Sequence, residues 1–377
     1  MMNRVNSIDY LRGLMAISIL LYHFTSWTIG VPQSETILGR LGIYGVSIFY
    51  IVSGMSMYIS YKSTSWTIKS TISFFIRRFA RLAPVYWIAM FWLIFLTVAS
   101  SSAGSPFLPF ELSRIIYNAT LTFGILEPKA YLVTGGWSIG NEVAFYLFFP
   151  LLMLAIKNKY LFATTNIAIL CAYIYYGFFV IDSGATIGDE WFNYIDPLNQ
   201  ALLFSGGICI AYLSMTHSSR ITNKWHIIMI ATCALFFVLL PGSGNQISII
   251  TEWNRVFFTI AILALSYFTF NVKAEGLSIP ERTLKFLGDI SYPVYLLHGV
   301  VFDTARVYIF PLLGDISPEA KLFFSLFVLV PFLTVISYVT YKFIEMPIIN
   351  LAKKITVIEK KYSHTGKMKN ETQLQTQ

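Results

Sequence analysis

Three ionisable side chains lie within the first long apolar stretch of the sequence: Asp9, Arg12 and His23. An Arg or Asp at the centre of a membrane helix costs roughly 2.5–3.5 kcal/mol on insertion scales, so such residues usually have a function. On a helix, Arg12 and His23 share one face to within about 20° and lie about 16 Å apart along the axis. This arrangement favours a helix that serves something crossing the membrane. The alternative is that Asp9 and Arg12 form a buried salt bridge and that a neighbouring helix provides the hydrogen-bond partner of His23.

A cluster of arginines lies at the start of a later apolar run. Arg77, Arg78 and Arg81 fall on one turn, and Tyr86 follows them. Guanidinium groups pair bidentately with phosphates, so this turn could hold the phosphates of a soluble donor. The plainer interpretation is that these residues anchor the helix at the lipid headgroups.

Two further stripes combine hydroxyl groups with an ionisable side chain. Ser138, Glu142 and Tyr146 recur every four residues after a Gly-Gly break and therefore share one helical face. The second stripe, late in the chain, consists of Ser291, Tyr295 and His298. The first stripe could also be a polar helix cap, and the second a hydrogen-bonded packing stripe.

His23, Glu142 and His298 all fall in the outer half of the predicted bilayer. His23 and Glu142 lie about 10 Å and 9 Å below the outer ends of their spans, and His298 lies about 16 Å above the inner end of its span. A carboxylate can accept a hydrogen bond from one imidazole nitrogen and leave the other free to take a proton. We therefore predict that Glu142 orients His23.

The composition is that of a multi-span membrane protein. Hydrophobic residues make up 56% of the chain and charged residues 12%, against about a quarter charged in soluble domains. Long apolar segments of this kind predict an all-α, polytopic bundle of about ten transmembrane helices. These segments are approximately 10–30, 41–61, 83–100, 136–156, 160–181, 197–216, 225–240, 252–270, 287–309 and 321–343.

The distribution of basic residues predicts the orientation. If the N-terminus is cytoplasmic, the inner segments hold most of the 27 Lys and Arg residues, so both termini are predicted to be cytoplasmic. We expect residues 1–350 to form the transmembrane domain and residues 351–377 a polar, lysine-rich, disordered tail. Cys171, Cys209 and Cys233 lie in apolar runs without metal-ligand spacing, so neither a metal site nor a disulfide framework is predicted.

Taken in order, these motifs resemble the integral-membrane acyltransferase-3 family, the multi-span O-acyltransferases that modify surface polysaccharides. The resemblance spans nearly the whole chain, and Met55 is a small departure, since the family more often has an aromatic residue there. The matching positions are Asp9, Arg12 and His23; Phe49, Ser53 and Gly54; Arg77, Arg78, Arg81, Pro84 and Tyr86; Trp137, Ser138, Glu142, Phe145 and Tyr146; Gly288, Ser291, Tyr295 and His298; and Tyr341, Glu345 and Pro347.

The resemblance implies transfer of an acyl group, commonly acetyl, from cytoplasmic acyl-CoA (acetyl-CoA) to a hydroxyl of a surface glycan. The acceptor would be an O-antigen, an exopolysaccharide or a lipid-linked glycan at the outer face of a bacterial inner membrane. Acyl-CoA would be a co-substrate, no bound cofactor is implied, and the bilayer is the other partner, with no nucleic acid. Members often carry an appended soluble domain that completes the transfer. This sequence ends shortly after the tenth predicted span, so we expect the chain either to finish the transfer itself or to pass the acyl group on.

The resemblance also implies residue roles. His23 would be the general base or a transient acyl carrier, Glu142 would orient it, and Arg12 would complete the catalytic set. Two other interpretations stay open: a transporter or flippase of a lipid-linked sugar, for which no internal repeat is visible, and a catalytically silent relative. The implied acyl-CoA-binding residues are Arg77, Arg78, Arg81 and Tyr86. The implied site-shaping residues are Asp9, Ser53, Trp137, Ser138, Tyr146, Tyr295 and His298.

Overall fold

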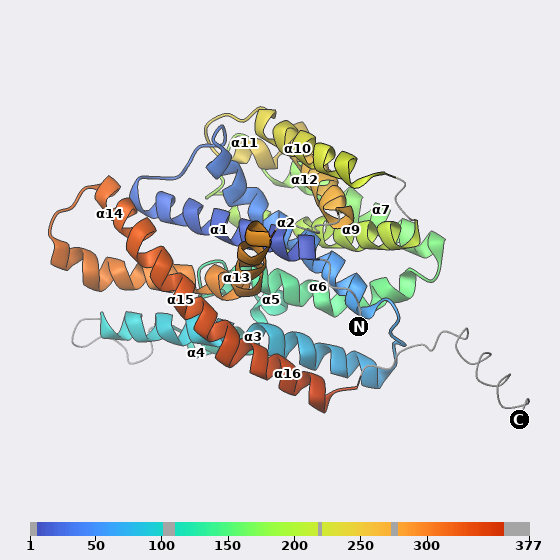
Figure 1. The fold of residues 1–377 in the computed structure, drawn as a ribbon, viewed down its shortest axis with the longest axis horizontal. Coiled ribbons are helices and arrows are strands. Elements are labelled where there is room, and N and C mark those ends of the chain that lie inside the picture. The colour runs from blue at the N-terminus through green and yellow to red at the C-terminus, as the bar shows by residue number, and fades with distance from the viewer. Residues whose placement is uncertain (1–5, 101–109, 218–220, 273–277, 358–377) are drawn as a thin grey trace, which may run out of the picture.

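The computed structural model describes residues 6–100, 110–217, 221–272 and 278–357 of the chain (Figure 1). The described residues are 83% helical and contain no strand, which confirms the all-α prediction. The long helices are α1 (Asn6–Thr28), α2 (Ile37–Tyr61), α3 (Ile68–Ala99), α6 (Gly136–Ala155), α7 (Lys159–Tyr175), α9 (Pro197–Thr216), α10 (Asn223–Leu239), α12 (Glu252–Asn271), α13 (Ser278–Thr304), α15 (Val330–Thr340) and α16 (Met346–Ile355). The short ones are α4 (Leu112–Thr120), α5 (Phe123–Leu126), α8 (Trp191–Tyr194), α11 (Ile247–Ile250) and α14 (Pro318–Phe324).

Eight helical stretches of the described chain are long and apolar enough, by length and composition, to cross a membrane. They include the continuous stretches Glu281–Leu313 and Pro318–Ile355, in which π-helical turns join the α-helical parts. Helix α1 is not among the eight and carries Asp9 and Arg12, and α10 has 17 residues. Each of the ten predicted segments thus coincides with helix, while the number of spans stays a prediction.

Helices α1 and α13 cross closely in the part of the fold that holds the site. A Cβ on Gly13 would lie 2.7 Å from the backbone nitrogen of Gly288, and a Cβ on Gly288 would overlap the carbonyl oxygen of Asp9. Only glycine permits backbones to approach so closely. His23 and His298 each follow their glycine by ten residues, so this crossing brings the two histidines to the same height.

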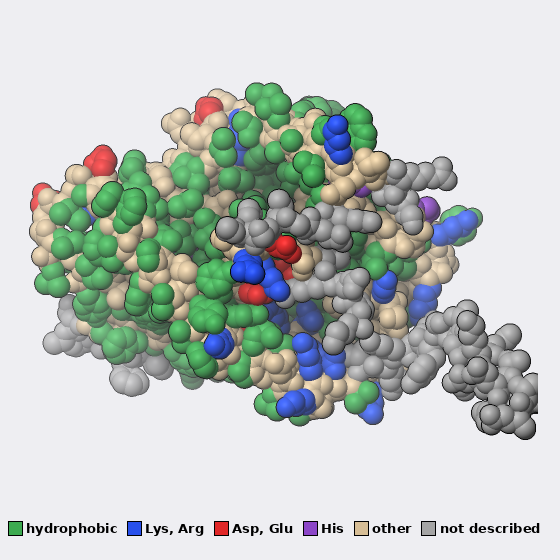
Figure 2. All heavy atoms as spheres, viewed as in Figure 1, with side chains coloured by type: hydrophobic (Ala, Val, Ile, Leu, Met, Phe, Trp, Pro, Cys, Tyr) green, Lys and Arg blue, Asp and Glu red, His purple; other side chains and the backbone are tan. Residues whose placement is uncertain are grey.

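The remaining helices pack around this pair. Helix α13 lies between α1 and α3, α2 packs against both α1 and α9, and α16 lies along α3 (Figure 1). Helices α10 and α12 pack together at the opposite edge. Figure 2 shows hydrophobic side chains over the left half of one face, and most Lys and Arg side chains of that face in the right half, where α3 begins and α16 ends.

The C-terminal boundary differs from the predicted one. Helix α16 continues to Ile355, and both Ala352 and Thr356 are buried. Arg77 donates hydrogen bonds to the side chain and carbonyl of Thr356, at 2.6 and 2.8 Å, which fastens this end of α16 to α3. The predicted tail therefore begins later than residue 351, and residues 358–377 lie outside the described part of the chain.

Candidate active site

Two histidines from α1 and α13 meet near one end of the bundle. Nε2 of His298 lies 2.9 Å from Nδ1 of His23, the ring centroids are 4.9 Å apart, and the ring planes are inclined by 17°. A nitrogen–nitrogen distance this short is that of a hydrogen bond between the two imidazoles, whose planes are nearly parallel. His23 is partly exposed, whereas His298 is fully buried.

Aromatic rings hold this histidine pair in place. The indole of Trp27, one turn beyond His23 on α1, lies nearly parallel to both imidazoles, with centroids 5.0 Å from His23 and 5.8 Å from His298. Phe302 packs against Trp27 at 4.9 Å. Such offset contacts between parallel rings stabilise one orientation of each ring. Tyr22 contacts the edge of His23 at 5.3 Å.

The orienting role predicted for Glu142 is not what the structure shows. Glu142 accepts a hydrogen bond from the Tyr146 hydroxyl at 2.7 Å, and no hydrogen bond joins it to His23 among the described residues. Equal depth in the bilayer does not bring side chains together unless their helices pack. Helix α1 packs mainly against α13 and α2, whereas α6 packs mainly against α5, α9 and α3. The neighbour that His23 finds is therefore His298.

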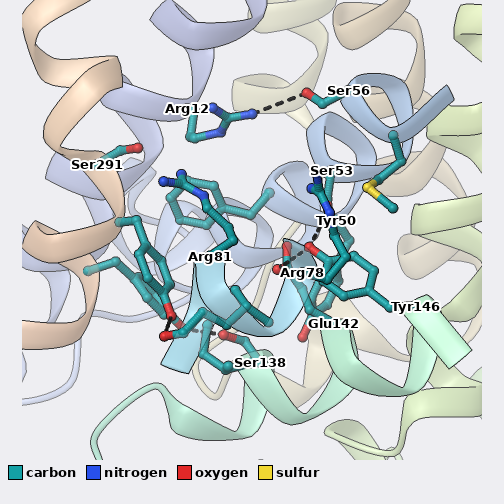
Figure 3. Close-up of a pocket in the computed structure, with 16 residues that line it drawn as sticks. Arg12, Tyr50, Ser53, Ser56, Arg78, Arg81, Ser138, Glu142, Tyr146 and Ser291 are labelled. Atoms are coloured by element: carbon teal, nitrogen blue, oxygen red, sulfur yellow. Dashed lines mark hydrogen bonds between the residues drawn. The ribbon is translucent and has the colours of Figure 1, made fainter. Parts of the chain in front are cut away.

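Glu142 instead lines a cavity of about 110 Å³ together with three arginines (Figure 3). Figure 3 shows Arg12 from α1 and Arg78 and Arg81 from α3 around this space, with Glu142 below them on α6. Other polar residues that line the cavity are Ser53, Ser56, Ser138, Tyr146, Ser291 and Tyr295. Residues from each of the predicted stripes on α1, α3, α6 and α13 thus line one cavity, whereas His23 and His298 do not.

Two of the three arginines are neutralised within the protein. Arg12 pairs with Asp9 at 2.9 Å and donates to the Ser56 hydroxyl at 3.1 Å, so Asp9 supports Arg12. Arg81 forms an ion pair with the buried Glu345, and its guanidinium lies 5.3 Å from the centre of the Tyr292 ring.

Arg78 differs from its two neighbours. It donates to the Tyr61 hydroxyl at 3.2 Å and lies over the rings of Tyr61 and Tyr146, at 5.3 and 5.9 Å. Its Nε is buried without a hydrogen-bond partner, and no carboxylate of the described chain forms an ion pair with it. A partly buried cation in this condition is suited to an anionic ligand.

A second cavity of about 220 Å³ opens where α2 ends and α3 begins. Arg78 and Arg81 line both cavities, so the two spaces meet at these side chains. Arg77 and Lys353 line only the second one, and the guanidinium of Arg77 is engaged by the end of α16. Of the three arginines predicted to bind a donor, only Arg78 and Arg81 line both cavities.

Tyr86 does not lie where a donor-binding residue is expected. It is fully buried, bonds through its hydroxyl to Asn118, and lines neither of these two cavities. Asn118 also accepts from the backbone nitrogen of Leu132 at 3.0 Å. Tyr86 therefore fixes the segment before α6. Trp137 is likewise buried, with Trp191 and Tyr194 against it at 5.6 and 5.9 Å.

Tyr295 separates the arginine-lined cavity from the histidine pair. Its hydroxyl donates to the carbonyl of Gly135 at 3.1 Å and lies 2.8 Å from the Ser138 hydroxyl. Its ring lines the cavity on one side, and the ring centroid lies 6.1 Å from that of His298. Gly135 adopts a positive φ of 75°, which glycine tolerates best.

The acyltransferase domain model matches residues 5–342, almost the whole described chain. The chain belongs to the acyltransferase-3 family. Nodulation protein 10 of Rhizobium leguminosarum bv. viciae is 25% identical to it over 79% of this chain and 83% of that protein. The peptidoglycan O-acetyltransferase OatA of Listeria monocytogenes serovar 1/2a is 24% identical over 91% of this chain and 56% of its own length. The chain thus spans little more than half of that relative. No solved structure matches the chain.

Sequence reasoning missed two features of this acyltransferase-3 site. Trp27 lies four residues after His23, the spacing at which helical side chains meet, so its contact was accessible to prediction. The pairing of His23 with His298 has a weaker signal, the equal spacing of ten residues from Gly13 and Gly288. That signal becomes informative only once the two glycines are known to face each other.

Proposed function

We propose that this acyltransferase-3 protein is a membrane O-acyltransferase that moves an acyl group, commonly acetyl, from cytoplasmic acyl-CoA to a hydroxyl of a cell-surface glycan. The observation that carries the proposal is that the arginine-lined cavities and the histidine pair adjoin at Tyr295. Two arginine-lined cavities meet at Arg78 and Arg81 and lead to Tyr295, which lies against the histidine pair. The name of the Listeria relative, an O-acetyltransferase, supports the same class of reaction.

The donor is assigned to the arginine side because coenzyme A carries phosphates. These need cationic partners before they can approach the apolar interior, and Arg78 has no carboxylate partner among the described residues. The cavities, of about 110 and 220 Å³, are smaller than the roughly 300–1,000 Å³ typical of drug-sized ligands. They suit the narrow thioester arm, with the nucleotide at the mouth beside Lys353.

The acceptor is assigned to the histidine side. In the simplest sequence His23 takes the proton of the acceptor hydroxyl, whose oxygen attacks the thioester carbonyl carbon. The carbon–oxygen bond forms, the carbon–sulfur bond breaks, and the leaving sulfur takes the proton back from His23. The hydroxyls of Tyr295 and Ser138, which both donate to the carbonyl of Gly135, would turn to donate to the negative charge on the carbonyl oxygen of the thioester. Glu142 balances the positive charge of the arginine cavity.

The test compares His23→Ala with the wild-type chain in cells that lack the native copy. General-base assistance contributes roughly 10²–10⁴-fold, so O-acyl esters on the surface glycans should fall by about that factor at equal amounts of inserted protein. NMR of the released glycans measures the esters, and the exposed His217→Ala is the matched control. Undiminished esters in the His23 variant would refute the proposed role of His23. No difference between cells with and without the chain would favour transport of a lipid-linked sugar.

A further inference from the structure

We propose that His298 is the positioning residue of this site: it fixes His23 in the tautomer that leaves Nε2 of His23 free to take the acceptor proton. The inference rests on the proposed acyl transfer for its functional part, whereas the tautomer itself follows from the geometry. It replaces the carboxylate orienter expected from the sequence with a neutral ring.

The argument begins at the buried end of the histidine pair. Nδ1 of His298 lies 2.6 Å from the backbone carbonyl oxygen of Tyr295. A carbonyl oxygen can only accept, so Nδ1 of His298 carries a proton and donates it. In a neutral imidazole only one nitrogen is protonated, and Nε2 of His298 must then be an acceptor.

The proton between the two rings is therefore supplied by His23. Nδ1 of His23 lies 2.9 Å from Nε2 of His298 and donates to it. This uses the single ring proton of a neutral His23 and leaves a lone pair on its Nε2. The order of hydrogen bonds runs from His23 through His298 to the carbonyl of Tyr295, and each step fixes the next.

The opposite order would require a charged His298. Its ring would then donate from both nitrogens and force the proton of His23 onto Nε2, which could no longer act as a base. A buried imidazolium needs a counter-charge, and no Asp or Glu of the described chain forms an ion pair with either histidine. The surrounding rings of Trp27 and Phe302 supply none. The neutral pair is the arrangement that this environment stabilises.

Exposure separates the two roles. His298 is fully buried and its nitrogens are both engaged, so it does not touch a substrate. His23 is partly exposed and has one free nitrogen. When Nε2 of His23 takes a proton, the positive charge forms next to the lone pair of His298, which stabilises it.

Glutamine provides a conservative replacement for His298. The amide oxygen of Gln lies near the position of Nε2 in histidine and can accept from His23, whereas leucine has a similar size and no acceptor. We expect His298→Gln to retain turnover to within about ten-fold and His298→Leu to lose roughly 10²–10⁴-fold, the value of general-base assistance. The KM for acyl-CoA should be unchanged in both variants, because neither removes an arginine. The exposed His217→Gln serves as the matched control.

The direct readout is the nitrogen NMR spectrum of the full-length protein in lipid nanodiscs, with ¹⁵N-labelled histidine. His23→Gln identifies the signals of His23, which in the wild type should show a protonated Nδ1 and an unprotonated Nε2. His298→Leu should abolish this preference and His298→Gln should retain it. A protonated Nε2 on His23 in the wild type would overturn the proposal, and so would equal losses of turnover in both His298 variants. A protein with the expected tautomer but no transferase activity would instead contradict the proposed function and leave the positioning role of His298 intact.

Discussion

The arginine-lined cavity and the histidine pair lie on either side of Tyr295 and solve the problem of buried polar groups in opposite ways. Around the cavity the groups are charged, and carboxylates from within the chain neutralise Arg12 and Arg81. The histidine pair has no ion pair in the described structure, and its hydrogen bonds end on a backbone carbonyl. One region is built to hold charge, and the other to keep a base neutral.

This difference explains why each region has one incomplete group. Even a partly buried charge without a carboxylate partner is costly, so in the proposed function Arg78 is the position at which an anion from outside would bind. A neutral imidazole is costly only if its nitrogens lack hydrogen bonds, and the histidine pair leaves one nitrogen of His23 free. In the proposed function, donor binding and proton transfer are thereby separated, with Tyr295 between them.

The largest effect on the cavity side is expected from Arg78→Ala. Hydrogen bonds to charged groups contribute about 1.5–3 kcal/mol, so the affinity for acyl-CoA should fall about 10- to 100-fold. Arg77→Ala is the matched control, because its guanidinium is held by Thr356 and the end of α16. It should change the KM for acyl-CoA by about two-fold or less. Initial rates against acyl-CoA concentration measure both, and equal effects of the two variants would break the distinction between a binding arginine and an anchoring one.

Much of this architecture was accessible to sequence reasoning. Helices occupy all ten of the apolar stretches that were predicted to be helical. This follows because a segment buried in lipid must satisfy its backbone hydrogen bonds within a helix. The residues that gather around the site, from Arg12 and Ser53 to Glu142 and Tyr295, were also predicted. Spacing on a helix fixes which side chains share a face, and this information is local.

Lateral packing was not accessible in the same way. Depth placed His23 and Glu142 at one height, but the close approach of Gly13 to Gly288 decides that α13 and not α6 supplies the partner of His23. Tyr86 follows the arginines at a suggestive spacing, yet Asn118 from a distant short helix engages it. Contacts of this kind depend on which helices touch, and that is a property of the whole bundle.

A smaller effect is expected at the boundary between the two regions. A Cβ on Gly135 would meet the hydroxyl oxygen of Tyr295 at 2.8 Å, so Gly135→Ala should displace this ring. We expect turnover to fall about ten-fold, since misplacing a site residue by 1 Å can cost about 10²-fold. Gly244→Ala is the matched control, because Gly244 also has a positive φ, of 60°, and a Cβ at Gly244 would have nothing within 4 Å.

Both glycine variants place a side chain on a residue with positive φ, which should lower the stability of each by about 1–2 kcal/mol. Thermal unfolding in detergent measures the loss of stability that the two variants share, and the rate of acyl transfer measures the difference in turnover between them. A loss of turnover in Gly244→Ala as large as that in Gly135→Ala would mean that backbone strain, and not the position of Tyr295, controls the rate.

The smallest effect is expected on the histidine side, at Trp27. Its indole lies parallel to His23 at 5.0 Å, and such aromatic contacts contribute about 0.5–1.5 kcal/mol, so Trp27→Ala should lower turnover by about two- to ten-fold. Trp27→Phe retains a parallel ring and should lose less. Trp253→Ala is the control, because Trp253 is also exposed but packs against Phe178. The KM for acyl-CoA should stay constant in all three variants, since no arginine is touched. A change in that KM at Trp27 would show that the two regions are coupled through Tyr295 and do not act separately.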